Sequence, residues 1–214
     1  MIEVQKKEIS KSVLKRLPIY LSYLKSLSDE IPNISATALA SALSLGEVQV
    51  RKDLAMVSDG GRPKIGYNRL GLIDDIEQFL GYDNTNDAVL IGAGGLGGAL
   101  LGYTGFAEYG LNIVAAFDAK REMVGKFKSG KKIHAMEELK KFCQDNKILM
   151  GIITVPAEHA QSVCNVLIES GILAIWNFAP VHLDVPEGIL VQNENMATSL
   201  AVLSKHLSVQ IGNI

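Results

Sequence analysis

The sequence predicts an α/β protein in two parts, in which a small helical unit is followed by a parallel β-sheet with helices on both faces. From residue 88 onward, short apolar runs alternate with helical segments, which is typical of a covered parallel sheet. Residues 1–84 instead place their apolar side chains at helical spacing. A polar, turn-rich stretch at residues 81–87 marks the boundary between the two parts.

The composition is that of an ordinary folded protein. Hydrophobic residues make up 48% of the chain and charged residues 21%, so disorder is not expected. The longest apolar stretches, such as residues 148–155, are too short to span a bilayer, and the N-terminus has no apolar signal core. We therefore expect a cytoplasmic protein without a membrane partner. Its two cysteines support neither a disulfide framework nor a metal cluster, and Cys164 is expected in the core.

Charge is divided unevenly along the chain. Residues 1–73 carry eleven Lys and Arg against seven Asp and Glu, whereas residues 74–214 carry ten against sixteen. A basic front half on an acidic body is typical of a nucleic-acid-binding unit. Because the surplus is small, an ordinary solvated surface stays open as an alternative at this point.

The front unit is predicted to begin with three helices. The first covers residues 15–27, with Pro18 in its first turn, and its inward face holds four leucines: Leu17, Leu21, Leu24 and Leu27. Ser35 is a suitable N-cap for a second helix over residues 36–43. After a tight turn, a third helix covers residues 47–57, and its inward face is formed by Val50, Leu54 and Val57.

The second and third helices, joined by a short turn, have the layout of a helix-turn-helix. Polar and charged residues are left on the other faces of the third helix: Gln49, Arg51, Lys52 and Asp53. The following stretch, residues 58–67, combines turn-forming glycines with Arg62 and Lys64 and ends at Tyr67, which suits the hairpin of a winged helix. We therefore predict a winged-helix DNA-binding domain, with a plain surface hairpin as the alternative.

A helix over residues 70–80 is expected to lead into the second part. The strands predicted there cover residues 88–91, 112–117, 149–155, 172–178 and 189–192, and the helices cover residues 95–109, 136–145 and 157–170. Pro156 lies in the first turn of the last of these helices and Gly171 lies just past its end.

A glycine-rich turn follows the first of these strands and opens a helix: Gly92, Ala93, Gly94, Gly95, Leu96 and Gly97. In a dinucleotide-binding turn, the first glycine permits the tight turn, the second lets the backbone approach a pyrophosphate, and the third lets the helix pack closely. An apolar strand ends in Asp118 about twenty residues later, where a carboxylate binds an adenosine ribose. Asp118 favours NAD(H) over NADP(H), although Lys120 and Arg121 weaken that preference. The pattern predicts a Rossmann-type domain.

No catalytic site accompanies this cofactor site in the sequence. The four histidines are scattered, and none comes with the acidic partner and arginine that hydride transfer requires. Metal-ligand spacing is absent as well. The sequence therefore predicts a dinucleotide that acts as a signal and is not turned over.

Short motifs spread over nearly the whole chain carry a family resemblance: residues 15–21, 49–54, 92–97, 103–106, 113–118, 154–158, 177–181 and 185–188. In this order they resemble the Rex family of redox-sensing transcriptional repressors. The resemblance implies a homodimer that binds a palindromic double-stranded operator when NAD⁺ predominates and releases it when NADH binds. It also implies three segments: residues 1–84 bind DNA, residues 85–195 bind NAD(H), and residues 196–214 form a helix swapped into the partner subunit.

The same resemblance implies roles for individual residues. Arg16, Tyr103 and Asn195 would belong to a switch region near the nicotinamide, and Arg51 and Lys52 would lie on the recognition helix. Besides the glycine-rich turn and Asp118, the cofactor site would include five residues: Tyr103, Thr154, Val155, Pro156 and Asn177.

The chain departs from the family pattern at two places. Residues 56–61 replace the aromatic-glycine repeat that is common after the recognition helix, and Asn195 stands where many relatives have an aspartate. One alternative is therefore a family member that binds DNA but has lost redox sensing. The other is a small enzyme or enzyme subunit that binds a nucleotide such as CoA on a similar sheet, although such a domain does not need the basic front unit.

Overall fold

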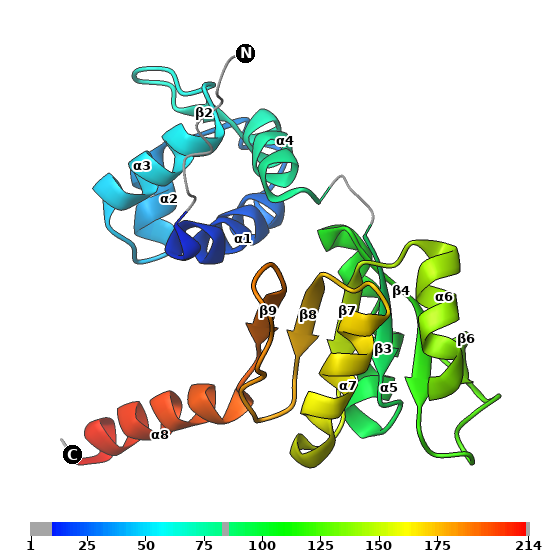
Figure 1. The fold of residues 1–214 in the computed structure, drawn as a ribbon. Helices are drawn as coiled ribbons and strands as arrows, with labels where there is room; N and C mark the ends of the chain where they lie inside the picture. Colours follow the sequence, from blue (N-terminus) through cyan, green and yellow to red (C-terminus); the bar gives the residue numbers. More distant parts are fainter. Residues whose placement is uncertain (1–9, 83–85, 213–214) are drawn as a thin grey trace. The chain divides into compact units, whose positions relative to one another are not determined.

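The chain folds into two compact units, which we call unit 1 (Met1–Asn84) and unit 2 (Thr85–Ile214). The computed structural model describes residues 10–82 and 86–212 (Figure 1). Within these ranges, no helix is long and apolar enough to cross a membrane. Unit 1 is mostly helical, and unit 2 is built on a seven-stranded sheet.

The described part of unit 1 combines helices with one short pair of strands. The helices are α1 (Lys11–Ser26), α2 (Ala36–Ala42), α3 (Glu47–Val57) and α4 (Arg69–Leu80). Strands β1 (Asn33–Ile34) and β2 (Tyr67–Asn68) pair in antiparallel register. All four helices contribute side chains to one buried cluster, among them Leu17, Leu39, Leu54 and Ile76. The helix-turn-helix is thus held by an apolar core of its own.

The predicted second and third helices are confirmed. The Ser35 Oγ accepts a hydrogen bond from the Ala38 N–H at 3.0 Å and so caps α2. The first helix, in contrast, begins four residues before its predicted start, at Lys11, with Ser10 as its N-cap. Pro18 therefore lies inside α1 and not in its first turn. Because proline has no N–H, the Leu14 carbonyl lacks its usual helical donor.

Asp53 corrects the prediction that the polar side chains of the third helix face away from the core. It is only 2% exposed. Its Oδ2 accepts a hydrogen bond from the Arg16 Nε at 2.7 Å, and its Oδ1 accepts one from the Arg16 Nη2 at 3.0 Å. The Tyr20 hydroxyl also donates to Oδ2, at 2.8 Å, and the Gln49 Nε2 donates to Oδ1 at 3.4 Å. A buried carboxylate needs such partners, and here α1 supplies most of them to α3.

The same contacts shift the pKa values of the groups involved. Burial alone would raise the pKa of Asp53, but hydrogen bonds from Arg16, Tyr20 and Gln49 outweigh burial and hold this pKa below its usual value. Burial, followed by the hydrogen bond to Asp53, raises the pKa of Tyr20 to about 12. The hydrogen bond to Asp53 raises the pKa of Arg16. All three groups therefore keep their pairing at neutral pH.

Unit 2 has a seven-stranded sheet in the order β5-β6-β4-β3-β7-β8-β9. The strands are β3 (Asn86–Ile91), β4 (Leu111–Asp118), β5 (Phe127–Lys128), β6 (Lys131–Ala135), β7 (Met150–Ile153), β8 (Ala174–Asn177) and β9 (Leu190–Asn193). All neighbours run parallel except β5, which is antiparallel to β6. Numbered along the chain from β3, the six parallel strands have the order 3-2-1-4-5-6 of dinucleotide-binding folds, which reverses direction between β3 and β7.

Helices cover the two faces of this sheet unequally. The helical segments are α5 (Gly95–Gly102), η1 (Thr104–Tyr109), η2 (Met136–Glu138), α6 (Leu139–Asn146), α7 (Ala157–Glu169) and α8 (Met196–Gly212). Cys143 of α6 and Cys164 of α7 pack into the buried cluster on one face, which confirms Cys164 as a core residue. The other face packs against α5 through Leu101. The β4–β6 and β8–β9 connections contain no helix in the described residues, so this second face is covered by α5 and η1.

The predicted strands are confirmed, but two strands were missed. Strand β6 begins with two lysines, and Ile133 is its only buried residue. Its sequence therefore lacks an apolar run. Strand β5 is two residues long. The helix predicted over residues 95–109 is divided at Tyr103 into α5 and the 3₁₀ segment η1.

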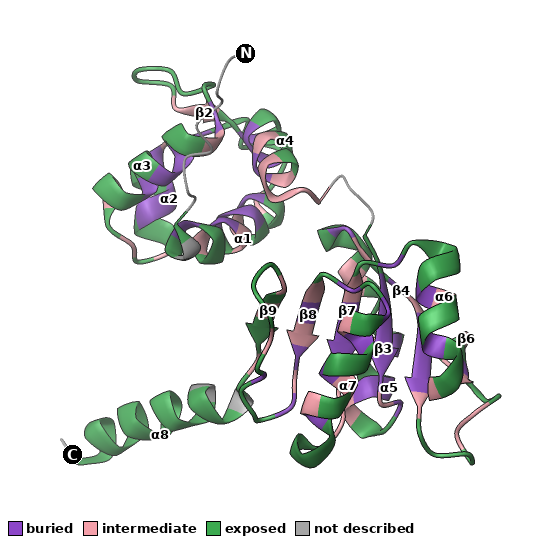
Figure 2. Ribbon diagram, in the orientation of Figure 1, coloured by how far each residue is buried: buried purple, intermediate pink, exposed green. Residues whose placement is uncertain are grey.

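The C-terminal helix α8 carries an exposed apolar stripe. Leu200, Leu203, Leu207 and Ile211 recur at helical spacing, and each is more than half exposed. Figure 2 shows α8 exposed along its described length. An apolar stripe of this length on one helix marks an interaction surface.

We expect Asp53→Asn to lower the free energy of unfolding of unit 1 by about 3 kcal/mol, because the substitution removes the charge that pairs with Arg16. Since the folded-state pKa of Asp53 lies below the unfolded value of about 3.9, the wild-type pairing stabilises unit 1 above that pH and is lost as the pH falls through the folded pKa. We expect the midpoint temperature of thermal unfolding, measured between pH 7 and pH 3, to show this loss of stability in the wild type but not in Asp53→Asn.

The matched control is Asp59→Asn, which alters an exposed carboxylate of the same unit. This variant should behave as the wild type. If Asp53→Asn and the wild type lost stability in parallel on acidification, the buried pair would not be the stabilising interaction.

Candidate nucleotide site and DNA interface

The glycine-rich turn lies where the strand order reverses. It follows β3, while residues 154–156 follow β7, so the two loops meet at the carboxyl edge of adjacent strands. The Thr154 hydroxyl joins them, because its single proton lies within hydrogen-bond reach of two carbonyl oxygens, that of Gly92 at 2.7 Å and that of Ile91 at 2.9 Å. This crevice is the usual ligand position in an open parallel sheet.

The glycines of the turn have separate roles. Gly92 has a φ of 98°, a region that disfavours residues with a Cβ. A Cβ at Gly97 would collide with the Gly92 carbonyl oxygen. The predicted tight turn at Gly92 and close packing at Gly97 are thus confirmed. A Cβ at Gly94 or Gly95 would meet nothing within 4 Å, so open space lies in front of the first turn of α5, where backbone N–H groups are available to an anion.

Asp118 ends β4 beside this turn. Its Oδ2 accepts a hydrogen bond from the Ala93 N–H at 2.8 Å, and its Oδ1 accepts one from the Lys120 N–H at 2.9 Å. The carboxylate is therefore fixed against the second residue of the glycine-rich turn. This is the position from which an acid reaches the ribose of a dinucleotide that lies on the turn.

The other predicted cofactor residues differ in accessibility. Val155 lies against Gly92, and Pro156 is the N-cap residue of α7. Tyr103 follows α5 and is 56% exposed. Its ring makes an edge-to-face contact with Phe106 at 4.8 Å between centroids, and Phe106 contacts Trp176 in the same way at 5.6 Å. An aromatic row therefore extends from Tyr103 into unit 2.

Asn177, also predicted at the cofactor site, has a fully buried side chain. The Asn177 Nδ2 donates to the Asn193 Oδ1 at 2.8 Å and to the carbonyls of Ala179 and Val181. Its Oδ1 accepts a hydrogen bond from the Ala179 N–H at 3.0 Å. This side chain holds the loop after β8 to β9, and its role in cofactor binding stays a prediction.

The three predicted switch residues have local partners in their own units. Arg16 of unit 1 is paired with Asp53. Asn195 of unit 2 caps the start of α8, since its Oδ1 accepts a hydrogen bond from the Thr198 N–H at 3.2 Å. With Tyr103 on the aromatic row, each residue has a structural role of its own, and a joint switch stays a prediction.

The predicted DNA-contacting residues of α3 are exposed. Gln49, Arg51 and Lys52 all face solvent. Arg51 forms an ion pair with Glu47 one turn earlier, whereas Lys52 has no ion pair within residues 10–82. Lys52 is therefore the cation of this helix that is most readily available to a phosphate or a base edge.

The predicted wing is a short hairpin. Arg62 and Gly66 exchange two backbone hydrogen bonds of 2.9 Å, which closes a tight turn around Lys64. The side chains of Arg62 and Lys64 are exposed at this tip. The Tyr67 ring, in contrast, packs against Gly61 inside the hairpin, so it supports the wing from within.

One cation at the glycine-rich turn is not predicted by the sequence motifs. The Lys128 Nζ donates hydrogen bonds to the carbonyls of Ala93 at 3.0 Å and Gly94 at 2.9 Å. Lys128 belongs to β5, a strand that the sequence did not predict. The available signal was the cluster of lysines over residues 126–132, which has no apolar pattern to indicate a hairpin.

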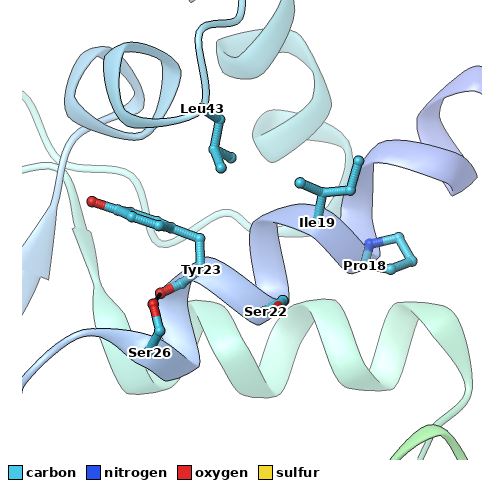
Figure 3. Close-up of a pocket in the computed structure, with 6 residues that line it drawn as sticks. All are labelled: Pro18, Ile19, Ser22, Tyr23, Ser26 and Leu43. Carbon is cyan, nitrogen blue, oxygen red and sulfur yellow. Dashed lines mark hydrogen bonds between the residues drawn. The ribbon is translucent and has the colours of Figure 1, made fainter. Parts of the chain in front are cut away.

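A shallow hollow lies on unit 1, between α1 and the end of α2 (Figure 3). Its walls are Pro18, Ile19, Ser22, Tyr23, Ser26 and Leu43. None of these residues carries a charge, and the hollow shares no residue with the exposed cations of α3 or with the glycine-rich turn. In the described ranges, no three His, Cys, Asp or Glu side chains form a group that could hold a metal ion. The glycine-rich turn and the cations of α3 are thus the features suited to ligands.

Comparison with known proteins agrees with both features. A family model described as "CoA binding domain" matches residues 83–181, and one described as "Putative DNA-binding protein N-terminus" matches residues 8–55. The redox-sensing transcriptional repressor Rex of Treponema denticola is 42% identical over 191 residues, which cover 89% of this chain and 91% of that protein. Rex of Bacteroides fragilis is 38% identical over 210 residues, 96% of each chain.

Solved structures of the Rex-family repressor RSP are similar over 96% of this chain. RSP in complex with beta-NAD⁺ and operator DNA has a TM-score of 0.89 at 33% identity and covers 96% of this chain and 95% of its own. RSP in complex with beta-NADH has a TM-score of 0.87 at 32% identity, with 96% and 97% covered. The match of the front unit and of full-length repressors argues against an isolated CoA-binding enzyme subunit. With relatives this similar over nearly the whole of both chains, the protein belongs to the Rex family of redox-sensing transcriptional repressors.

Proposed function

We propose that this protein is a DNA-binding transcriptional repressor that senses the NADH/NAD⁺ ratio in the cytoplasm. It occupies a palindromic operator with NAD⁺ or without nucleotide and leaves it when NADH binds. The observation that carries the proposal is that RSP, which is similar along 96% of this chain, forms one complex with beta-NAD⁺ and operator DNA and another with beta-NADH. Its relatives are repressors and not enzymes, which agrees with a cofactor that acts as a regulatory ligand and is not turned over.

The proposed dinucleotide site lies on the glycine-rich turn of the second domain, residues 85–195. The diphosphate binds at the N–H groups of the first turn of α5, and Asp118 accepts hydrogen bonds from the adenosine ribose. Residues 154–156 form the wall across the crevice, and Tyr103 lies toward the nicotinamide. The open space at Gly94 and the position of Asp118 at Ala93 support this arrangement.

The redox state is proposed to be read at the nicotinamide, which carries a positive charge in NAD⁺ and none in NADH. Apolar walls penalise the charged ring by desolvation. The aromatic row of Tyr103, Phe106 and Trp176 supports such a wall. A 100-fold preference for NADH corresponds to about 2.7 kcal/mol, which shifts a suitably balanced two-state equilibrium.

DNA release is proposed to follow from the dimer geometry. The first domain, residues 1–84, binds one half-site, and the helix of residues 196–214 is swapped into the partner subunit. The exposed stripe of Leu200, Leu203 and Leu207 supports this dimer. Two recognition helices must lie ~34 to 36 Å apart, or a multiple of this, to enter successive major grooves. A small rotation between subunits therefore breaks simultaneous docking.

The test is an operator-binding titration at fixed salt, because salt alone changes such affinities strongly. A labelled palindromic duplex, selected in vitro with this protein, is followed by fluorescence anisotropy while NADH or NAD⁺ is added. We expect micromolar NADH to release the duplex and NAD⁺ at the same concentration to leave it bound. If both nucleotides leave binding unchanged although the duplex binds specifically, the protein binds DNA without sensing the redox state.

Loss of a recognition-helix cation should separate the two activities. We expect Lys52→Ala or Arg51→Ala to weaken specific operator binding by about tenfold or more, since each removes a contact to a base edge or phosphate. NADH affinity, measured by NADH fluorescence, should stay at the wild-type value. The control is Lys140→Ala, which removes an exposed lysine of unit 2. An equal loss of both affinities in Lys52→Ala would indicate unfolding.

The converse separation is expected at the ribose. Asp118→Ala removes a charged hydrogen-bond acceptor, so we expect NADH and NAD⁺ affinities to fall by more than about tenfold. Operator binding without nucleotide should be unchanged. Asp145→Ala, at an exposed carboxylate of α6, serves as the control. Unchanged nucleotide affinity in Asp118→Ala would place the ribose elsewhere.

A further inference from the structure

Lys128 and Asp118 both bind the backbone of the glycine-rich turn. The Lys128 Nζ donates to the carbonyls of Ala93 and Gly94, whereas the Asp118 carboxylate accepts from the Ala93 N–H. The two oppositely charged groups, from β5 and from the end of β4, therefore bind the donor and acceptor sides of the same short backbone segment. Such paired contacts fix the direction in which its peptide groups point.

Helix α5 is shaped to admit this lysine. Gly98 is buried, and its N–H bonds the Gly94 carbonyl at 2.9 Å in the first turn of the helix. A Cβ at Gly98 would collide with the Cε and Nζ of Lys128. The lysine can therefore lie across the helix only because residue 98 has no side chain.

The charge of Lys128 lacks a counterion in the described structure. Within residues 10–82 and 86–212, Lys128 forms no ion pair, and its two acceptors are neutral carbonyls. An ammonium group has three N–H donors, so one remains for a further partner. Nearby, a Cβ at Gly94 or Gly95 would meet nothing within 4 Å, so the space beside the start of α5 is open. A partly buried cation beside a helix N-terminus is completed by an anion.

We propose that Lys128 is a positioning residue for the diphosphate of the bound dinucleotide. By holding the carbonyls of Ala93 and Gly94, it directs the N–H groups of the first turn of α5 toward the diphosphate and adds a fixed positive charge beside it. This inference rests on the proposed function of the glycine-rich turn. The chemical class recognised is a nucleoside diphosphate, which NAD⁺, NADH and ADP share.

The test compares ligands with and without phosphate. Dissociation constants are measured for NADH by its fluorescence and for ADP and adenosine by competition. We expect Lys128→Met to weaken NADH and ADP by about tenfold, as for loss of one charge-assisted contact, and to change adenosine affinity by less than about twofold. The control is Lys126→Met, which removes an exposed charge from the same hairpin. It should weaken ADP far less.

A second variant keeps the charge and removes the contact. The methyl group in Gly98→Ala displaces the end of the lysine while alanine favours the helix, so the fold is retained. We expect ADP affinity to fall as in Lys128→Met, by about tenfold. In the double variant the two losses of ADP affinity should not add, because both substitutions remove the same contact of Lys128 with the turn.

Three results would overturn the inference while leaving the proposed function intact. These are unchanged ADP affinity in Lys128→Met, equal losses for ADP and adenosine, and fully additive losses in the double variant. If the wild-type protein bound neither NADH nor ADP, the proposed function itself would fail.

Discussion

A single buried carboxylate, Asp53, fixes how helix α3 packs within unit 1. It joins α3 to α1 through Arg16 and Tyr20, and removal of one partner from a buried pair costs several kcal/mol. Helix α3 therefore cannot turn about its axis without leaving a charge unpaired. The outward direction of Lys52 follows from this restraint. Any change that draws Arg16 away from Asp53 would act on α3 directly and so would connect the proposed switch arginine with the proposed recognition helix.

Unit 2 uses the same principle at the glycine-rich turn. The Thr154 hydroxyl, the Asp118 carboxylate and the Lys128 ammonium each bond a different backbone group between residues 91 and 94. These three side chains come from the ends of β7 and β4 and from the edge hairpin. The turn is thus preformed by contacts with distant parts of the chain, so little ordering is left for the ligand to accomplish.

The features that the sequence predicts are those encoded locally. The turn at Gly92, the acid at Asp118 and the bounds of α3 follow from residues close to one another in the chain. Asp53 lies between Val50 and Leu54 on the inward face, but its burial depends on Arg16, 37 residues away, so an acid there is naturally assigned to solvent. The position of Lys128 could not be predicted, because a two-residue strand such as β5 has no hydrophobic periodicity. The motif around Asn177 likewise indicates a polar residue at the end of a strand, but it does not show that the side-chain amide is buried.

Affinity and redox discrimination depend on different ends of the ligand. The diphosphate and adenosine ribose are identical in NAD⁺ and NADH, so in the proposed site Asp118, Lys128 and the glycine-rich turn would interact with both forms alike. Contacts that NAD⁺ and NADH make alike cannot give the two ligands different effects on a conformational equilibrium. Discrimination must therefore arise beyond the diphosphate, where the aromatic row begins at Tyr103. In the proposed site, Lys128 would therefore affect the total nucleotide concentration at which the site fills, whereas the NADH/NAD⁺ ratio to which the repressor responds would be set at the nicotinamide.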